Sequence, residues 1–262
     1  MSDDIKKVYF NIKNKDFKNA IELLFKIENQ GKNFWMYDYL KGFCFSQIRD
    51  FSSSLYYYEK ALNETSDKPL ILNAMGSAYQ KIHNYTESIN CYDNAIELLD
   101  KKETASLKFS LYQKDLLSEL FNNLGVALQS NSCEKKTEYL SWNSLIAHYN
   151  SITILEETFK IIANKKVQTV FCNKREFFKN QKENVIKELR FKTENYTLFN
   201  VNLASQLFRL GEIEKSKKCI INCIKNINNS HKFWNLAKSS LLDILFIANN
   251  KGVENPNNLF FQ

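Results

Sequence analysis

Few side chains in this sequence are spaced so that they could do chemistry together. Its three histidines, His83, His148 and His231, are scattered, and none lies in an HExxH or Cys-x2-Cys context. They therefore predict no metal site. Cys219 and Cys223 lie one helical turn apart and share a helix face, which two metal ligands would require, but buried free cysteine is common in protein cores. We expect reduced structural thiols and no metal.

No catalytic or nucleotide-binding arrangement is visible. Glu156 and Glu157 are adjacent in sequence, so they diverge on a helix and do not aim at one substrate atom. A loop that cradles phosphate needs glycines close together, whereas the six glycines of this chain are isolated from one another. We therefore expect a protein that is not an enzyme and that binds no cofactor.

The composition is that of a folded helical protein. Of its 262 residues 44% are hydrophobic and 25% are charged, but it has only six Gly and two Pro. These shares lie below the usual ones of about 7% and 5%, which argues against a turn-rich all-β fold. The formal charge of +7 comes mainly from Lys. Because arginines are few and scattered, no nucleic-acid partner is expected.

The N-terminal sequence MSDDIKKVYF carries acidic residues where a signal peptide needs a basic end followed by an apolar run. Nor does any stretch approach the roughly 18 apolar residues of a membrane span. We expect a cytoplasmic chain without a transmembrane span, and consider peripheral membrane association as an alternative.

An internal repeat is the strongest pattern. An acidic or amide residue, an aromatic residue and then a small residue recur at a constant interval as Asp16-Phe17-Ala20, Asp50-Phe51-Ser54 and Asn84-Tyr85-Ser88. Gly42 and Gly76 are separated by the same interval, and each is followed three positions later by an aromatic side chain. A period of about 34 residues is the length of one helix-turn-helix repeat unit.

These positions resemble the tetratricopeptide repeat (TPR) family, whose repeat has a helix A with Leu-Gly and Tyr and a helix B with Ala, Phe and Ala. The third unit carries the family positions as Leu72, Met75, Gly76, Tyr79, Ser88, Tyr92 and Ala95. A match near the C-terminus comprises Leu203, Ala204, Leu207, Gly211, Ser216, Ile220 and Cys223. The resemblance covers about two thirds of the chain and implies an all-α, TPR-like superhelical solenoid of antiparallel helix pairs.

The pattern divides the chain into four segments. Residues 1–132 hold about three TPR-like repeats and a partial fourth around Gly125, which lies fifteen positions beyond the place that the period sets after Gly76. We expect these extra residues to lengthen helix B of the third repeat and its loop. Residues 193–248 hold a C-terminal repeat and a capping helix that starts near Trp234. Residues 249–262 form a flexible tail, in which Leu259-Phe260-Phe261 could fill a groove of this or a neighbouring chain.

Residues 133–192 do not fit the period. An amphipathic helix is indicated by the spacing of Leu145, Tyr149, Ile152, Leu155, Phe159 and Ile162. Either a turn at Asn164–Lys166 makes this segment an inserted long, Lys-rich helical hairpin, or one long helix runs through it. Residues 151–192 hold ten basic and five acidic side chains. They form a solvated face or a docking surface for an acidic partner or membrane. The candidate binding residues are Lys165, Lys166, Lys174, Arg175, Lys179 and Lys182.

By family position, the inner surface of the solenoid is formed by helices A and is apolar and aromatic here. Its candidate partner-binding residues are Tyr9, Met36, Tyr39, Phe43, Asn73, Ser77 and Gln80, with Ile5 beside them. An apolar groove suits an amphipathic helix or an extended hydrophobic segment of another protein. Alternatively, each aromatic ring packs against the next repeat.

The expected function is that of a non-catalytic protein–protein interaction scaffold that binds and stabilises a partner protein. Two alternatives remain. One is a chaperone or adaptor that holds a short peptide or an export substrate, and the other is attachment to an anionic surface through the basic hairpin.

Overall fold

The computed structural model describes residues 3–31, 34–105, 111–135, 138–168, 183–186, 188–190, 194–225 and 234–249. Within these ranges all regular structure is α-helical, which confirms the all-α prediction. The chain divides into two compact units, Met1–Ser106 and Leu107–Gln262. This division groups residues 107–132 with the C-terminal half, whereas the sequence pattern placed them with the N-terminal repeats. The tail expected from residue 249 onward lies, apart from Asn249 itself, outside the described residues.

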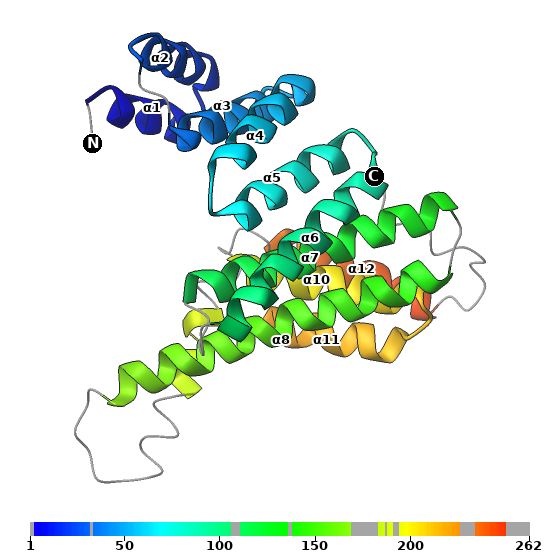
Figure 1. Cartoon of the computed structure of the whole chain (residues 1–262). Coiled ribbons are helices and arrows are strands. Elements are labelled where there is room, and N and C mark those ends of the chain that lie inside the picture. Colours follow the sequence, from blue (N-terminus) through cyan, green and yellow to red (C-terminus); the bar gives the residue numbers. More distant parts are fainter. Residues whose placement is uncertain are drawn as a thin grey trace. The chain divides into compact units, whose positions relative to one another are not determined.

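The first unit consists of three antiparallel helix pairs (Figure 1). They are α1 (Asp3–Lys13) with α2 (Phe17–Asn29), α3 (Trp35–Gln47) with α4 (Phe51–Glu64), and α5 (Lys68–Lys81) with α6 (Tyr85–Ala105). Each helix contacts the next along the chain, as in a stack of repeats. At 21 residues α6 is longer than α2 and α4, which confirms that extra residues lengthen helix B of the third repeat.

One turn conformation joins helix A to helix B in each of these pairs. It places a residue in the left-handed region, with φ of 59° at Lys15, 66° at Arg49 and 61° at His83. The next residue caps both helices. The Asp50 N–H donates back to the Phe45 carbonyl at 3.0 Å, and the Asp50 carboxylate accepts from the Ser53 N–H at 3.1 Å. His83 is thus an exposed turn residue.

Glycine brings the two helices of a repeat into close contact. A Cβ atom on Gly42 would lie 2.6 Å from the ring of Tyr58, and one on Gly76 would lie 2.6 Å from the ring of Tyr92. Both rings are almost fully buried. The glycines of the repeat signature therefore provide the space that the rings of helix B fill.

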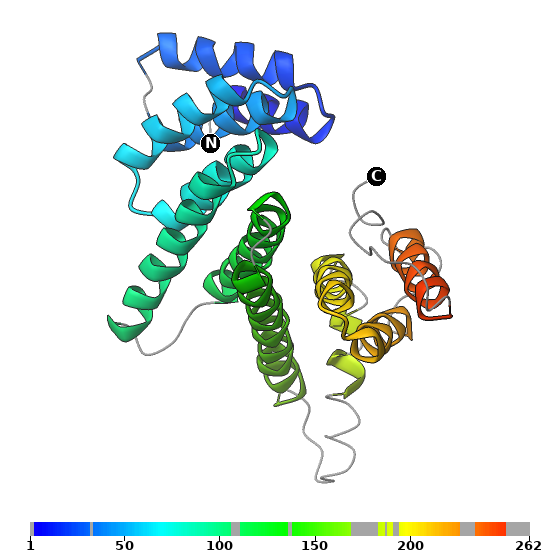
Figure 2. The ribbon, with the colours of Figure 1, turned by 90° about the vertical axis from the view of Figure 1, so that its right-hand side faces the viewer.

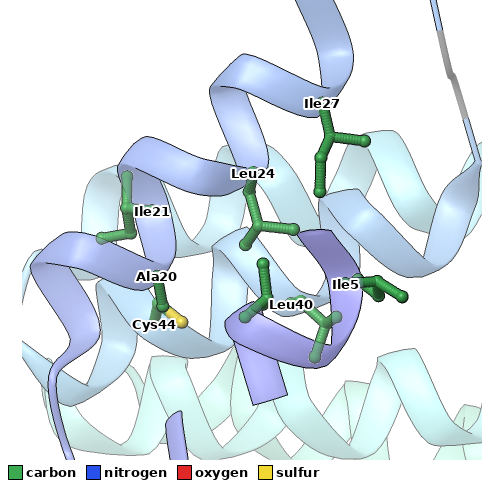
Figure 3. Packing of buried hydrophobic residues seen from close by; sticks show 8 residues of the cluster. Ile5, Ala20, Ile21, Leu24, Ile27, Leu40 and Cys44 are labelled. Atoms are coloured by element: carbon green, nitrogen blue, oxygen red, sulfur yellow. The ribbon is translucent and has the colours of Figure 1, made fainter. Parts of the chain in front are cut away.

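The first repeat reaches the same packing with different residues. Val8 and Leu24 lie one period before the glycine and the ring, and both are completely buried. Together with Ile5, Ile27 and Leu40 they form a core between α1, α2 and α3 (Figure 3). A pair of medium-sized side chains thus replaces the pair of a very small and a very large residue.

The second unit begins with two long helices, α7 (Leu111–Lys135) and α8 (Glu138–Gln168), which pack side by side. It continues with α10 (Glu194–Arg209), α11 (Ile213–Lys225) and α12 (Trp234–Asn249), coloured yellow to red in Figure 2. The expected capping helix is thus present and starts at Trp234. Because α8 runs through residues 164–166, the turn proposed there is wrong. The alternative of one long helix through the whole segment is wrong as well, since Arg190 pairs with Glu156 of α8.

The pair α7–α8 repeats the signature of the third unit with a longer connection. Ser144, His148 and Ser151 on α8 are completely buried, as are Ser88, Tyr92 and Ala95 on α6. A Cβ on Gly125 would lie 2.7 Å from the His148 ring, and the Ser144 hydroxyl donates to the Gly125 carbonyl at 2.7 Å. The first half of α8 is therefore helix B of a fourth repeat, although the sequence pattern placed it outside the repeats.

Sequence separation explains why the sequence predicts only the first helix of this repeat. Gly42 and Tyr58 are sixteen positions apart, as are Gly76 and Tyr92, but Gly125 and His148 are twenty-three positions apart. The seven additional positions correspond to about one extra turn on each helix, since a turn takes about 3.6 residues. A constant repeat period cannot align such a pair.

His148 is the polar exception at this helix crossing. Its ring is completely buried, and among the described residues neither ring nitrogen has a hydrogen-bond partner. Burial lowers the pKa of His148 to about 3, because no group compensates the charge of an imidazolium there. The folded unit therefore holds this imidazole neutral.

A second polar exception lies in the core of the first unit. Asp38 and Lys41 occupy the positions that Leu72 and Met75 occupy one period later, and they are 5% and 1% exposed. The Lys41 ammonium lies 2.6 Å from the Glu28 carboxylate and 3.1 Å from that of Asp38. A compact ion cluster thus replaces apolar packing at this point.

The cluster is completed from α2 and α4. Lys60 donates to Glu28 at 2.9 Å, and the two lysine hydrogen bonds lower the pKa of the Glu28 carboxyl. The Lys41 ammonium also lies above the rings of Phe25 and Tyr57, at 5.1 and 5.0 Å from their centroids. Three consecutive helices therefore depend on one buried cation.

We expect the substitution Lys41→Met to lower the free energy of unfolding by about 3 kcal/mol, because it leaves the buried Asp38 carboxylate without its nearest cation. The double change Asp38→Leu, Lys41→Met copies the pair Leu72 and Met75 and is expected to recover most of this loss. Urea unfolding measures both values. Equal destabilisation by the single and the double change would show that charge pairing is not the cause.

The burial of His148 predicts a pH dependence of stability. Since its pKa is about 6.5 in the unfolded chain and about 3 in the fold, stability is complete above pH 6.5 and falls by about 1.4 kcal/mol per pH unit below it. In His148→Tyr this loss should disappear. The new hydroxyl would face Gln129, which corresponds to the Gln80 that accepts a hydrogen bond from Tyr92.

Urea unfolding at pH 7.5 and pH 5 tests this prediction. Between these two pH values the free energy of unfolding of the native protein should fall by about 2 kcal/mol more than that of His148→Tyr. His83→Tyr in the exposed turn is the control and should keep the native pH dependence. An unchanged pH dependence in His148→Tyr would contradict the assignment.

Candidate partner-binding surfaces

No group of three or more His, Cys, Asp or Glu side chains in the described ranges is placed to hold a metal ion. Cys219 and Cys223 face α10, where their thiols donate to the carbonyls of Asn200 at 3.5 Å and Thr197 at 3.9 Å. Burial raises the pKa of Cys219 to about 12 and that of Cys223 to about 11, so both thiols are protonated at neutral pH.

Inner positions of α1, α3 and α5 form two columns in the first unit, and the members of each column are one repeat period apart. One column consists of Ile5, Tyr39 and Asn73, and the other consists of Tyr9, Phe43 and Ser77. The first column is largely closed, because Ile5 is 5% and Asn73 is 8% exposed. Tyr39 is half-buried against Tyr58, with 5.8 Å between ring centroids. These residues therefore follow the alternative expectation, in which the side chains pack within the chain.

The second column, Tyr9, Phe43 and Ser77, is accessible, and we call it the inner column. Tyr9 is 42% exposed, Ser77 is exposed, and Phe43 is half-buried. The ring of Phe43 contacts Phe17 edge to face at 6.2 Å, which holds it in place while part of its surface remains open. The two other candidates, Met36 and Gln80, are half-buried on α3 and α5.

The basic segment of the sequence is described only at its ends. Lys165 and Lys166 lie in α8, but their side chains, together with Lys174, Arg175, Lys179 and Lys182, fall outside the described residues. The chain returns to α8 at Arg190, whose guanidinium donates to both Glu156 carboxylate oxygens at 2.8 and 2.7 Å. This bidentate pair fixes the two ends of the segment beside each other. Among the described helices, none combines the length and apolar character of a bilayer span.

A third surface was not found from the sequence. Trp142, Ile146 and Tyr149 on α8 are 44%, 56% and 44% exposed, although they lie on a helix whose opposite side is a buried core. We call them the outer stripe. The sequence spacing predicts that Tyr149 lies with Leu145 and Leu155 on the apolar side of this helix. In the structure Leu145 and Leu155 are buried, whereas Tyr149 is exposed. The first half of α8 is helix B of the fourth repeat, so the outer positions of helix B in the other repeats are the signal that identifies this stripe.

The sequence matches a family model described as "Psidin, N-terminal TPR repeats region" over residues 4–147. This match extends from α1 through α7 into α8, and so reaches the helix pair that Gly125 joins. A comparison with curated protein sequences found no match.

Three solved structures show similar helical arrangements. BtubC from P. vanneervenii is 14% identical with a TM-score of 0.54, over 95% of this chain and 81% of that one. The assembly chaperone of RpL4 (Acl4) is 11% identical with a TM-score of 0.44, over 96% of this chain and 99% of that one. The quorum sensor NprR from B. thuringiensis is 14% identical with a TM-score of 0.41, over 98% and 71%. Since the matched family model spans more than half of the 262 residues, this chain belongs to the tetratricopeptide repeat family.

Proposed function

We propose that this protein is a non-catalytic interaction scaffold that binds a partner protein through the inner column and thereby stabilises it. The observation that carries the proposal is that, at equivalent positions of consecutive repeats, Tyr9 is 42% exposed and Phe43 is half-buried, so that water reaches part of both rings. Large aromatic side chains that water reaches gain free energy when a partner covers them, at roughly 25 cal/mol per Å² of apolar surface.

The chemistry of the inner column changes along the stack. Tyr9 and Phe43 are aromatic, whereas Ser77 is small and polar. Half-buried Met36 adds apolar surface on α3, and Gln80 adds an amide on α5. This order favours a partner segment with apolar side chains at one end and exposed backbone or polar groups at the other. An amphipathic helix or an extended hydrophobic segment meets that requirement.

A weaker contact is proposed for the basic segment that Glu156 and Arg190 close. Its excess of basic side chains favours an acidic partner surface. Such a contact would act in addition to the inner column, and the salt dependence of binding distinguishes the two contacts. Charge attraction is screened above a few hundred millimolar salt, since the Debye length is then only about 3–5 Å, whereas apolar burial is not weakened in this way.

A bulky charge in the inner column tests the proposal. Ser77→Arg should weaken partner binding at least about tenfold, because it places an arginine where the partner would lie, and tenfold corresponds to about 1.4 kcal/mol. Thr86→Arg, at an exposed position on the outer side of α6 in the same unit, is the matched control and should bind normally. A photo-cross-linking amino acid in place of Tyr9, incorporated in the native cell, should capture the partner and so identify it. The partner is then titrated by calorimetry.

The same titrations decide among the alternatives. If Ser77→Arg binds as tightly as the native chain, the inner column is not the binding surface. Full affinity for a peptide of about ten residues favours the chaperone or adaptor function over a scaffold for a folded partner. Mixing with the true partner should also raise the melting temperature of both proteins.

A further inference from the structure

The outer stripe differs from the equivalent positions of the other repeats. Its three positions correspond to Lys18, Glu22 and Phe25 on α2, to Ser52, Tyr56 and Glu59 on α4, to Thr86, Asn90 and Asp93 on α6, and to Glu214, Lys218 and Ile221 on α11. Each of those sets has at most one large apolar side chain, whereas the outer stripe has three. A solvated helix face is polar, so the composition of α8 indicates that something covers it.

The stretch of chain that contains the outer stripe carries no charged side chain. Residues 139–155 contain no Asp, Glu, Lys or Arg, in a chain with 25% charged residues. The single histidine among them, His148, is buried and held neutral. An occupant of this face therefore gains from apolar contact and not from charge pairing.

The size of the outer stripe limits what the occupant can be. From Trp142 to Tyr149 it measures about 10 Å along the helix, and its side chains are already half-buried. A stable interface between separate molecules buries about 800 Å² on each side, which three half-exposed side chains do not supply. A segment of the same chain needs far less, because its effective concentration reaches the millimolar range.

We propose that residues 250–262, which follow α12, dock on the outer stripe through Leu259, Phe260 and Phe261. α12, from which this segment continues, belongs to the same compact unit as α8. The docking surface is separate from the inner column and does not depend on it.

Both reach and composition support this occupant. α12 packs on α10, and α10 packs on α8. Two interhelical spacings of about 8–10 Å therefore separate α12 from α8. The chain from Asn249 to Leu259 spans at most about 33 Å, which is enough to pass around one helix. Residues 255–262 have no charged side chain, so they match the uncharged surface of α8.

Fluorescence of Trp142 reports on the contact directly. In a chain with Trp35→Phe and Trp234→Phe, Trp142 is the single tryptophan. Its acrylamide quenching constant should rise about twofold when the chain ends at Asn249, as expected if docking covers about half of the exposed ring. The triple change Leu259→Ser, Phe260→Ser, Phe261→Ser should have the same effect. The matched control Asn255→Ser, Asn257→Ser, Asn258→Ser should have none.

A second measurement keeps the native tryptophans and probes the tail. Chymotrypsin should cut after Phe260 and Phe261 several-fold faster in Ile146→Ser, Tyr149→Ser than in the native chain, and Asn150→Ser, Thr153→Ser is the control. A peptide of residues 250–262 added at about millimolar concentration should restore the protection of Trp142 in the shortened chain.

Three results would overturn the proposal. The first is quenching and cleavage that do not change in any variant. The second is protection of Trp142 that disappears on dilution together with a dimer in sedimentation, which would assign the stripe to a second copy. The third is protection that appears only when another protein is added.

Discussion

The close crossing of helix A and helix B is the contact on which the rest of the structure depends. A backbone without a side chain at Gly42, Gly76 or Gly125 meets a ring on the facing helix, and this contact fixes the rotation of both helices about their axes. Once that rotation is set, every other position has an assigned direction. The inner column and the outer stripe are therefore consequences of one packing contact that recurs along the chain.

Polar side chains inside this framework are held in two different ways. Lys41 keeps its charge because carboxylates from two helices and two aromatic rings surround it. His148 lies where the two preceding repeats have Tyr58 and Tyr92, and it is held neutral. The first arrangement ties three helices to one register, while the second makes the α7–α8 crossing sensitive to protonation. In the third repeat the equivalent positions are apolar or aromatic, namely Leu72, Met75 and Tyr92.

Where the spacing is constant, the sequence predicts the structure well. The all-α fold, the helix pairs of the first unit, the long α6 and the start of α12 follow from signature residues such as Gly76 and Trp234. Helix B of the fourth repeat does not follow from them, because seven additional positions separate Gly125 from His148. Exposure is also beyond a periodic pattern. Tyr39 and Phe43 are both half-buried, and the rings that cover them, Tyr58 and Phe17, come from other helices.

The longer pair α7–α8 shows how a hairpin of this kind lengthens. Each added residue rotates the end of a helix by about 100°, so the connecting turn leaves from a different side unless each helix gains about one full turn. Adding about 3.6 residues to both helices returns the exit to its original azimuth. Extensions that preserve the stack of repeats therefore add about one helical turn to each helix of the pair. An insertion of half that size, shared between the two helices, would direct the next repeat away from the solenoid axis.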